Sequence, residues 1–103
     1  MNPLSLVIHA DARDEYAAAY AWYEERNPGA ALRFAAAIEK ALRLIPQTPE
    51  LWGKIDDEHR RCVVKGFPYA IIYLVHEELV HVIAFAHSRR RADYWQQRSI
   101  EDA

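Results

Sequence analysis

The last third of the chain contains three closely spaced runs that are rich in β-branched, aromatic and other apolar residues. They span residues 60–64, 69–76 and 79–87. The intervening segments, residues 65–68 and the pair Glu77-Glu78, have the length and composition of turns. Connections this short can join only antiparallel neighbours, because parallel strands need a long crossover. The pattern therefore predicts an antiparallel three-stranded meander, around which the rest of the chain must fold.

The central run of the meander is apolar on both sides. Successive strand residues point to opposite faces of a sheet. The residues on the two faces are Ala70, Ile72 and Leu74 on one side and Ile71, Tyr73 and Val75 on the other. Strands that are apolar on both sides are covered on both sides. We therefore expect two covers, one from helices and one from the C-terminal segment or a partner protein.

The N-terminal part of the chain predicts one more strand and a helix. Residues 4–9 alternate at period two, which is typical of a strand. Asp11 is the expected N-cap of the helix that follows, and Asp14 and Glu15 are expected in its first turn, where negative charge complements the helix dipole. We expect this helix to end near Asn27.

A second helix is predicted over residues 30–45, where apolar side chains recur at helical spacing. The tripeptide Asn27-Pro28-Gly29 before it is expected to form a turn, because proline disfavours helical geometry in the preceding residue and glycine tolerates positive φ. So short a connection makes the two helices an antiparallel hairpin. Their shared apolar stripe is expected to cover one face of the sheet.

Together these elements predict one α+β domain over residues 1–103, in the order β-α-α-β-β-β, with the helix hairpin packed on a mainly antiparallel sheet. The net charge is −2, so any affinity for a polyanion has to come from a local cluster such as Arg89–Arg91. No apolar run approaches the roughly 20 residues that span a bilayer. We expect a cytoplasmic protein with no membrane partner.

Several motifs follow one another along the predicted sheet and beyond it. They are Arg60-Arg61, the run from Phe67 to Tyr73, the sequence Ala86-His87-Ser88-Arg89-Arg90, and the pair Tyr94-Trp95. These motifs, in an order of strand, helix hairpin, meander and basic C-terminal segment, resemble the RelE/ParE family of bacterial type II toxins over nearly the whole chain. The chain departs from common family members in having Ala92 and Asp93 where a proline usually precedes the Tyr-Trp pair.

The resemblance implies a toxin that is encoded beside an antitoxin and is neutralised when the antitoxin's C-terminal segment wraps it in a hetero-oligomer. We expect a ParE-like plasmid stabilisation toxin that inhibits DNA gyrase. The alternative is a RelE-like endoribonuclease that cuts messenger RNA in the ribosome. A third possibility is a non-toxic subunit that binds an antitoxin in an autorepressor complex. Fold alone cannot choose among these functions, and whether the chain is an enzyme stays open at this point.

The candidate site residues differ between the two activities. A ribonuclease without a metal needs a base, an acid and fixed positive charge, and His87, Tyr94 and Arg61 could supply them. A docking surface for gyrase or an antitoxin needs basic and aromatic groups. The candidates for that surface are Arg60, Arg61, Arg89, Arg90, Arg91, Tyr94 and Trp95. The central strands supply few cations for an RNA cutter, so we favour docking.

Each candidate also has a structural interpretation. Tyr94 and Trp95 can close the exposed sheet face, and His87 can be a hydrogen-bonded structural histidine. Arg60 and Arg61 alternate across the pleat, so only one of them can point at a given site, and we favour Arg61.

No metal site and no cofactor are expected. The single cysteine, Cys62, lies within a predicted strand and is expected to be buried and inert. His81 shares strand parity with His87, but six residues along a strand is roughly 20 Å, too far for both to hold one ion.

Overall fold

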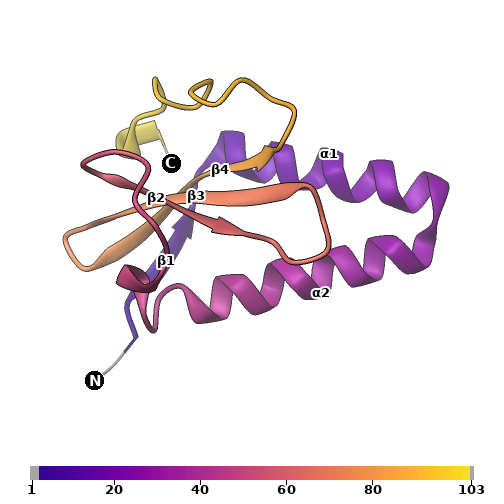
Figure 1. The fold of residues 1–103 in the computed structure, drawn as a ribbon, viewed down its shortest axis with the longest axis horizontal. Helices are drawn as coiled ribbons and strands as arrows, with labels where there is room; N and C mark the ends of the chain where they lie inside the picture. Colours follow the sequence, from indigo (N-terminus) through magenta and orange to yellow (C-terminus); the bar gives the residue numbers. More distant parts are fainter. Residues whose placement is uncertain (1–2, 103) are drawn as a thin grey trace.

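The computed structural model describes residues 3–102, which form the predicted order of strand, two helices and three strands (Figure 1). The elements are β1 (Ser5–Ile8), α1 (Ala10–Arg26), α2 (Pro28–Leu44), β2 (His59–Val63), β3 (Tyr69–His76) and β4 (Leu79–His87), with short 3-10 turns at Pro49–Leu51 and Ile100–Asp102. The predicted β-α-α-β-β-β order is confirmed.

The four strands form one sheet in the order β1-β4-β3-β2. The meander pairs β2 with β3 and β3 with β4 in antiparallel fashion, as predicted. β1 joins the sheet at the outer side of β4 and runs parallel to it. The connection between β1 and β4 contains the helix hairpin, β2 and β3, so it is long enough for a parallel pair.

A β-bulge in β4 changes which side chains share a face. Ile72 pairs with Ala84, but the next residue, Tyr73, pairs with Val82, so Ile83 is the extra residue. The bulge lets Val82 and Phe85 pack in one core cluster while Ile83 and Ala84 pack in the other. The expectation that His81 and His87 share a face is wrong for this reason, since His81 pairs with Leu74 and His87 with Tyr69 on the opposite side.

The start of α1 differs from the prediction. The helix begins at Ala10, and its N-cap is His9, whose side chain makes no capping hydrogen bond. Asp11 is inside the first turn, so it acts on the helix dipole rather than as the cap. Asp14 and Glu15 consequently lie beyond the first turn, and the half-buried Glu15 has a different set of partners, described below.

The junction between the helices is tighter than predicted. Asn27 alone separates α1 from α2, and its side chain accepts a hydrogen bond from the Ala30 backbone N–H at 3.1 Å. Pro28 is the first residue of α2, where its missing N–H costs nothing and its fixed φ suits the helix. The expected turn over Asn27-Pro28-Gly29 is therefore a cap followed by the first residues of α2.

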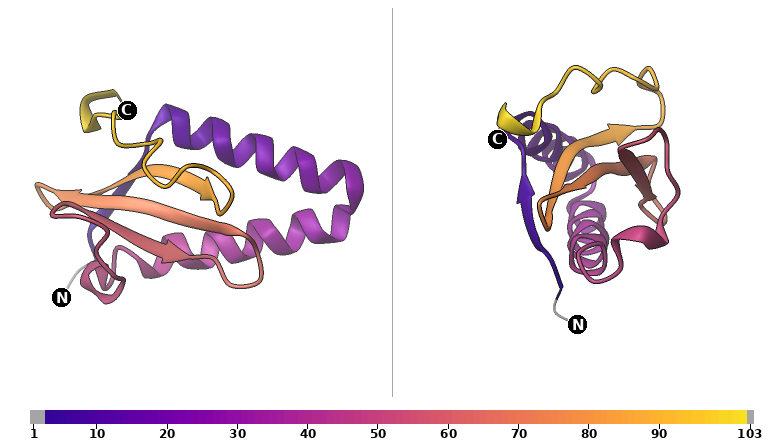
Figure 2. Two further views of the ribbon diagram at one scale, coloured as in Figure 1. Left: turned by 45° about the horizontal axis from the view of Figure 1, so that its top comes forward. Right: turned by 90° about the vertical axis from the view of Figure 1, so that its left-hand side faces the viewer.

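The helices and the C-terminal segment lie on opposite faces of the sheet (Figure 2). On the helix face, the largest buried side chains of the core include Phe34, Ile38, Ile71 and Tyr73. On the other face a smaller cluster forms where Trp95 packs against residues of β3 and β4. We call residues 93–102 the strap and this side of the sheet the strap face. The expectation that both faces of the sheet are covered is confirmed, with the helices on one face and the strap on the other.

Candidate interaction surface

The arginine triplet Arg89–Arg91, the basic segment, lies in the turn that follows β4. Two backbone hydrogen bonds hold the turn: the Ser88 N–H donates to Pro68 at 2.8 Å and the Arg90 N–H to His87 at 3.0 Å. The His87 ring also accepts the Arg89 N–H at its Nδ1 atom. All three arginines are exposed. The end of the sheet thus presents three cations on a backbone fixed to β3 and β4.

A cavity of about 260 Å³ lies beside the basic segment on the strap face. Its lining includes Arg61, His87, Arg90, Arg91 and Tyr94, together with apolar side chains from the ends of β3 and β4. We call it the sheet-face cavity. It brings together all three residues proposed for ribonuclease chemistry and most of those proposed for docking.

The two arginines of β2 have different environments. Arg60 donates hydrogen bonds to the carbonyls of Trp52 at 2.6 Å and Glu50 at 3.2 Å, so its guanidinium holds the loop before β2. Arg61 is exposed and lines the sheet-face cavity. The geometry places Arg61 at the candidate surface and gives Arg60 a structural role.

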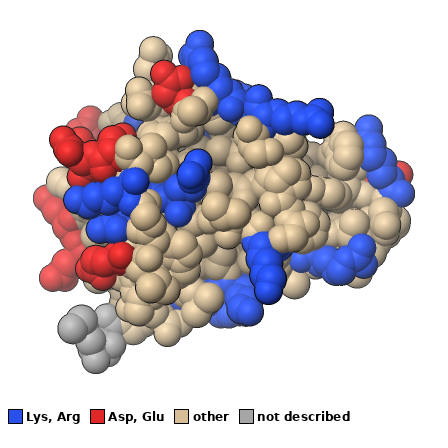
Figure 3. Space-filling view, viewed as in Figure 1, with Lys and Arg blue, Asp and Glu red and all other residues tan. Residues whose placement is uncertain are grey.

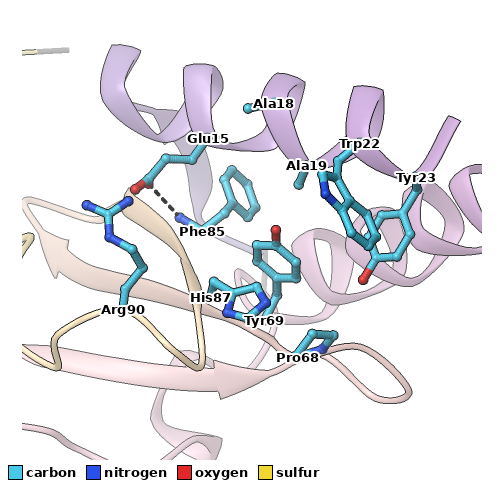
Figure 4. Close-up of a pocket in the computed structure, with 10 residues that line it drawn as sticks. All are labelled: Glu15, Ala18, Ala19, Trp22, Tyr23, Pro68, Tyr69, Phe85, His87 and Arg90. Atoms are coloured by element: carbon cyan, nitrogen blue, oxygen red, sulfur yellow. Dashed lines mark hydrogen bonds between the residues drawn. The ribbon is translucent and has the colours of Figure 1, made fainter. Parts of the chain in front are cut away.

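A second depression, the α1 groove, lies between α1 and the ends of β3 and β4 and has a volume of about 420 Å³ (Figure 4). Its walls are largely apolar and include Ala18, Trp22 and Tyr69. Trp22 is 53% exposed, which is unusual for so large an apolar side chain. His87 and Arg90 line both the groove and the sheet-face cavity, so the two depressions share a wall.

Two residues at this surface were not identified from the sequence, Glu15 of α1 and Arg98 of the strap. The Glu15 carboxylate accepts hydrogen bonds from the Tyr94 hydroxyl and from the Phe85 backbone N–H, the latter at 3.1 Å. Arg98 forms two further bonds to it, at 2.9 and 3.2 Å. The Arg98 side chain also lies 3.6 Å from Asp11. These contacts tie the strap to the start of α1.

Tyr94 is partly buried and is flanked by charged groups. The guanidinium of Arg90 stacks 3.8 Å from its ring centre, and that of Arg98 lies at 5.1 Å. Burial and the hydrogen bond to Glu15 raise the pKa of the Tyr94 phenol well above its usual range. The phenol proton therefore points at Glu15, which makes Tyr94 a poor proton donor for a substrate in the sheet-face cavity.

Trp95 is 1% exposed and packs against Ile72, Leu74, Ile83 and Ala84. The His59 ring lies 4.6 Å from it on the side of β2. A side chain buried this deeply cannot contact a partner directly while the strap is in place. The structure gives Trp95 the alternative role considered for it, that of closing the sheet face.

Charge is unevenly distributed over the surface. Figure 3 shows most of the acidic atoms at the left-hand end, where Figure 1 places the β3–β4 turn and the loop before β2. Basic atoms extend along the upper edge, and others lie along the lower edge, at the right-hand end and beside the acidic atoms, with uncharged surface between them. On this face the acidic residues are concentrated at one end, whereas the basic residues are spread over the surface, and the net charge is −2.

Comparison with known proteins identifies the family. A family model described as "ParE toxin of type II toxin-antitoxin system, parDE" matches residues 6–92, which include all of the sheet except Ser5, both helices and the basic segment. The chain belongs to the ParE toxin family. Its partner is accordingly an antitoxin. The family expected from the sequence motifs is confirmed, and the strap after residue 92 lies outside the matched segment.

A solved structure supports the fold of this ParE-family chain. It is titled "Chromosomal ParDE TA system from P. aeruginosa" and contains a chain that matches with a TM-score of 0.72 at 16% sequence identity. The match covers 82% of this chain and 95% of that chain. The expected RelE/ParE-like α+β fold is thereby confirmed. No curated protein matches this chain in sequence.

Side chains of the types that bind metal ions do not cluster in the described part of the ParE-family chain. Within residues 3–102, no group of three or more His, Cys, Asp or Glu side chains is arranged to hold an ion. Cys62 is 3% exposed, so the prediction that it is buried is confirmed, and burial raises the pKa of its thiol to about 11. None of the helices in this part of the chain is long and apolar enough to cross a membrane.

Proposed function

We propose that this ParE-family toxin inhibits DNA gyrase by docking through the surface formed by the basic segment and Arg61, and that a cognate antitoxin neutralises it. The observation that carries the proposal is the exposure of three adjacent arginines on a turn that backbone hydrogen bonds hold at the end of β4. Such a surface suits recognition of an acidic protein or a protein–DNA complex, because complementary charge accelerates and orients docking.

The state of Tyr94 also favours docking over catalysis. A metal-independent ribonuclease needs a proton donor near the leaving oxygen. The Tyr94 hydroxyl donates to Glu15 instead, and the pKa of Tyr94 is raised. Without that donor, the basic groups of the sheet-face cavity offer charge stabilisation but an incomplete acid–base pair.

The α1 groove supports the antitoxin part of the proposal. Its wall is mostly apolar, and Arg90 stands at one end while Arg26 stacks 4.0 Å over Trp22 toward the other. An apolar segment flanked by carboxylates would complement it. We propose that the acidic tail of the antitoxin lies there and, because His87 and Arg90 also line the sheet-face cavity, blocks the docking surface. Toxin and antitoxin would form a hetero-oligomer in the cytoplasm, where gyrase acts, and an arrangement of this kind could stabilise a plasmid.

The test is a pulse-labelling experiment in cells shortly after the toxin is induced without its antitoxin, with thymidine and amino-acid incorporation followed side by side. The proposal predicts that thymidine incorporation stops first while translation continues. An early stop in amino-acid incorporation would contradict it. Growth and incorporation that are both unaffected would instead identify a non-toxic, antitoxin-binding subunit of an autorepressor complex.

One observation favours a second function, ribosome-dependent cleavage of messenger RNA. His87, Arg61 and Tyr94 all line the same cavity, with Arg90 and Arg91 beside them. If this function is correct, His87→Ala and Tyr94→Phe each slow cleavage on purified ribosomes while ribosome binding is retained. Cleavage at the unaltered rate in both variants would remove these residues from the mechanism.

A further inference from the structure

We infer that Glu15 is a positioning residue for the docking surface, acting through Tyr94 on Arg90. The inference rests on the proposed function for its biological consequence, although the geometry it concerns can be measured without a target. It links residues from opposite ends of the chain, since Tyr94 is 79 positions from Glu15.

The first link is the carboxylate of Glu15. Its Oε1 atom accepts the Phe85 backbone N–H at 3.1 Å and an Arg98 N–H at 2.9 Å, and its Oε2 atom accepts the Tyr94 hydroxyl and a second Arg98 N–H. The Glu15 side chain is only 15% exposed and that of Arg98 only 17%. A carboxylate that receives four bonds in a partly dry site has one stable orientation, and the charged bonds are the strong ones.

The second link is the ring of Tyr94. The hydroxyl bond to Glu15 fixes where the ring lies, and the Arg90 guanidinium stacks on that ring at 3.8 Å. Backbone hydrogen bonds of the turn fix the main chain of the basic segment but leave a long arginine side chain free to rotate. The Tyr94 ring is the contact that selects one position for the Arg90 side chain, by a cation–π interaction.

Arg90 is the residue at which this position matters. It lines both the α1 groove and the sheet-face cavity, so its guanidinium is part of the wall between them. In Figure 4 the Arg90 guanidinium and the Glu15 carboxylate lie at the same end of the groove. Glu15 therefore helps to fix the position of the Arg90 guanidinium, which faces a target at the sheet-face cavity and an antitoxin tail at the α1 groove.

Two of the residues that position Arg90 lie outside the segment matched to the family. Tyr94 and Arg98 both belong to the strap, whereas the matched segment ends at residue 92. The basic segment itself lies inside the match. In this chain the strap and Glu15 thus act together on arginines that the matched segment carries.

The test compares Glu15→Gln with the matched control Asp14→Asn, which removes one charge from the neighbouring, exposed position of α1. The primary readout is the NMR ring-current shift of the Arg90 side-chain signals, because stacking on Tyr94 moves them upfield. We expect Glu15→Gln to reduce this shift by about half or more and to weaken gyrase inhibition on the order of tenfold, through loss of the charged bonds. The control should alter neither.

A double-variant experiment tests whether Glu15 acts through Tyr94. Tyr94→Phe keeps the ring and removes the hydroxyl, so it breaks the same link from the other side. If the inference is correct, Tyr94→Phe also reduces the Arg90 shift, and combining it with Glu15→Gln weakens inhibition no more than the stronger single change, since neither link works alone. Full additivity of the two changes would show that they act separately.

Failure of the inference is distinguishable from failure of the proposed function. An unchanged Arg90 shift in a folded Glu15→Gln protein overturns the inference, whatever the target. If Glu15→Gln does not fold, the Arg90 shift in Tyr94→Phe decides the question in the same way. If the unaltered toxin does not inhibit gyrase, the proposed function fails while the NMR result still stands.

Discussion

The two faces of the sheet are covered in different ways. On the helix face, α1 and α2 bury a broad aromatic core in which the Phe34 ring contacts the rings of Tyr16, Tyr23, Phe67 and Tyr69. On the strap face, one large side chain, Trp95, and the charged contacts at Glu15 hold a segment with little regular structure. The larger buried core therefore lies on the helix face, whereas the candidate docking surface depends on the strap face.

The largest effect is expected from truncation on the helix face. Phe34 is fully buried at 0% exposure, and Phe34→Ala should lower the free energy of unfolding by about 3–5 kcal/mol. Urea denaturation followed by circular dichroism measures this. If Phe34→Ala lowered the free energy of unfolding by less than Trp95→Ala does, the assignment of the main core to the helix face would be wrong.

Removal of the strap's anchor should have a smaller effect. Trp95→Ala is expected to lower the free energy of unfolding by about 2–3 kcal/mol. The cost is smaller than for Phe34→Ala because the strap can detach locally, so that no cavity remains in the rest of the fold. Amide hydrogen exchange should then show lost protection in the strap and retained protection in β3. Equal loss of protection in both segments would mean that the strap and the sheet unfold as one unit.

The α1 groove can be tested with two neighbouring alanines of α1. Both Ala17 and Ala18 are exposed, but only Ala18 lines the groove. Ala18→Glu should weaken binding of the cognate antitoxin on the order of tenfold, because it places negative charge against an acidic tail. Titration calorimetry with Ala17→Glu as the control measures the difference. Equal affinities of the two variants would exclude the groove as the antitoxin site.

The smallest effect concerns the far end of the strap face, where two buried histidines meet. His9 Nε2 lies 3.1 Å from His81 Nδ1. Burial lowers the pKa of His81, and the nearby His9 and His76 lower it further. The unfolded chain therefore binds a proton more readily than the folded one. The stabilisation is present above the ordinary histidine pKa of about 6.5 and is lost as the pH falls below it.

Urea denaturation between about pH 8 and about pH 5 measures this dependence. His81→Gln keeps a polar group that does not titrate. The free energy of unfolding of this variant should therefore depend less on pH than that of the unaltered protein. A profile identical to that of the unaltered protein would show that His81 does not titrate with unfolding.

The features that could be predicted from the sequence are those that depend on a local pattern of residues. Alternation at period two in residues 4–9, and runs rich in β-branched, aromatic and apolar residues in the last third, located all four strands to within about one residue, and the motifs identified the family. The errors arose where one residue's role depends on distant neighbours. Glu15 reads as a dipole-compensating acid until its partners Tyr94 and Arg98, which are 79 and 83 positions away, are seen in space.

The candidate site was predicted only in part for the same reason. The arginines and aromatic residues were recognisable by type, but burial of Trp95 and the engagement of Arg60 with Glu50 and Trp52 follow from how loops close over the sheet. The bulge at Ile83 has no local signature in an apolar strand, and it moved His87 to the face opposite His81.

The most direct test of the proposed function is a DNA gyrase supercoiling assay with a charge-reversed toxin. Arg89, Arg90 and Arg91 are replaced together by Glu, and the control replaces Arg33, Lys40 and Arg43, which are exposed on α2, in the same way. Both variants change the net charge equally. The proposal predicts that the first variant no longer inhibits gyrase although it stays folded, while the control inhibits as the unaltered toxin does. Undiminished inhibition by the first variant would contradict the proposal that this surface docks gyrase.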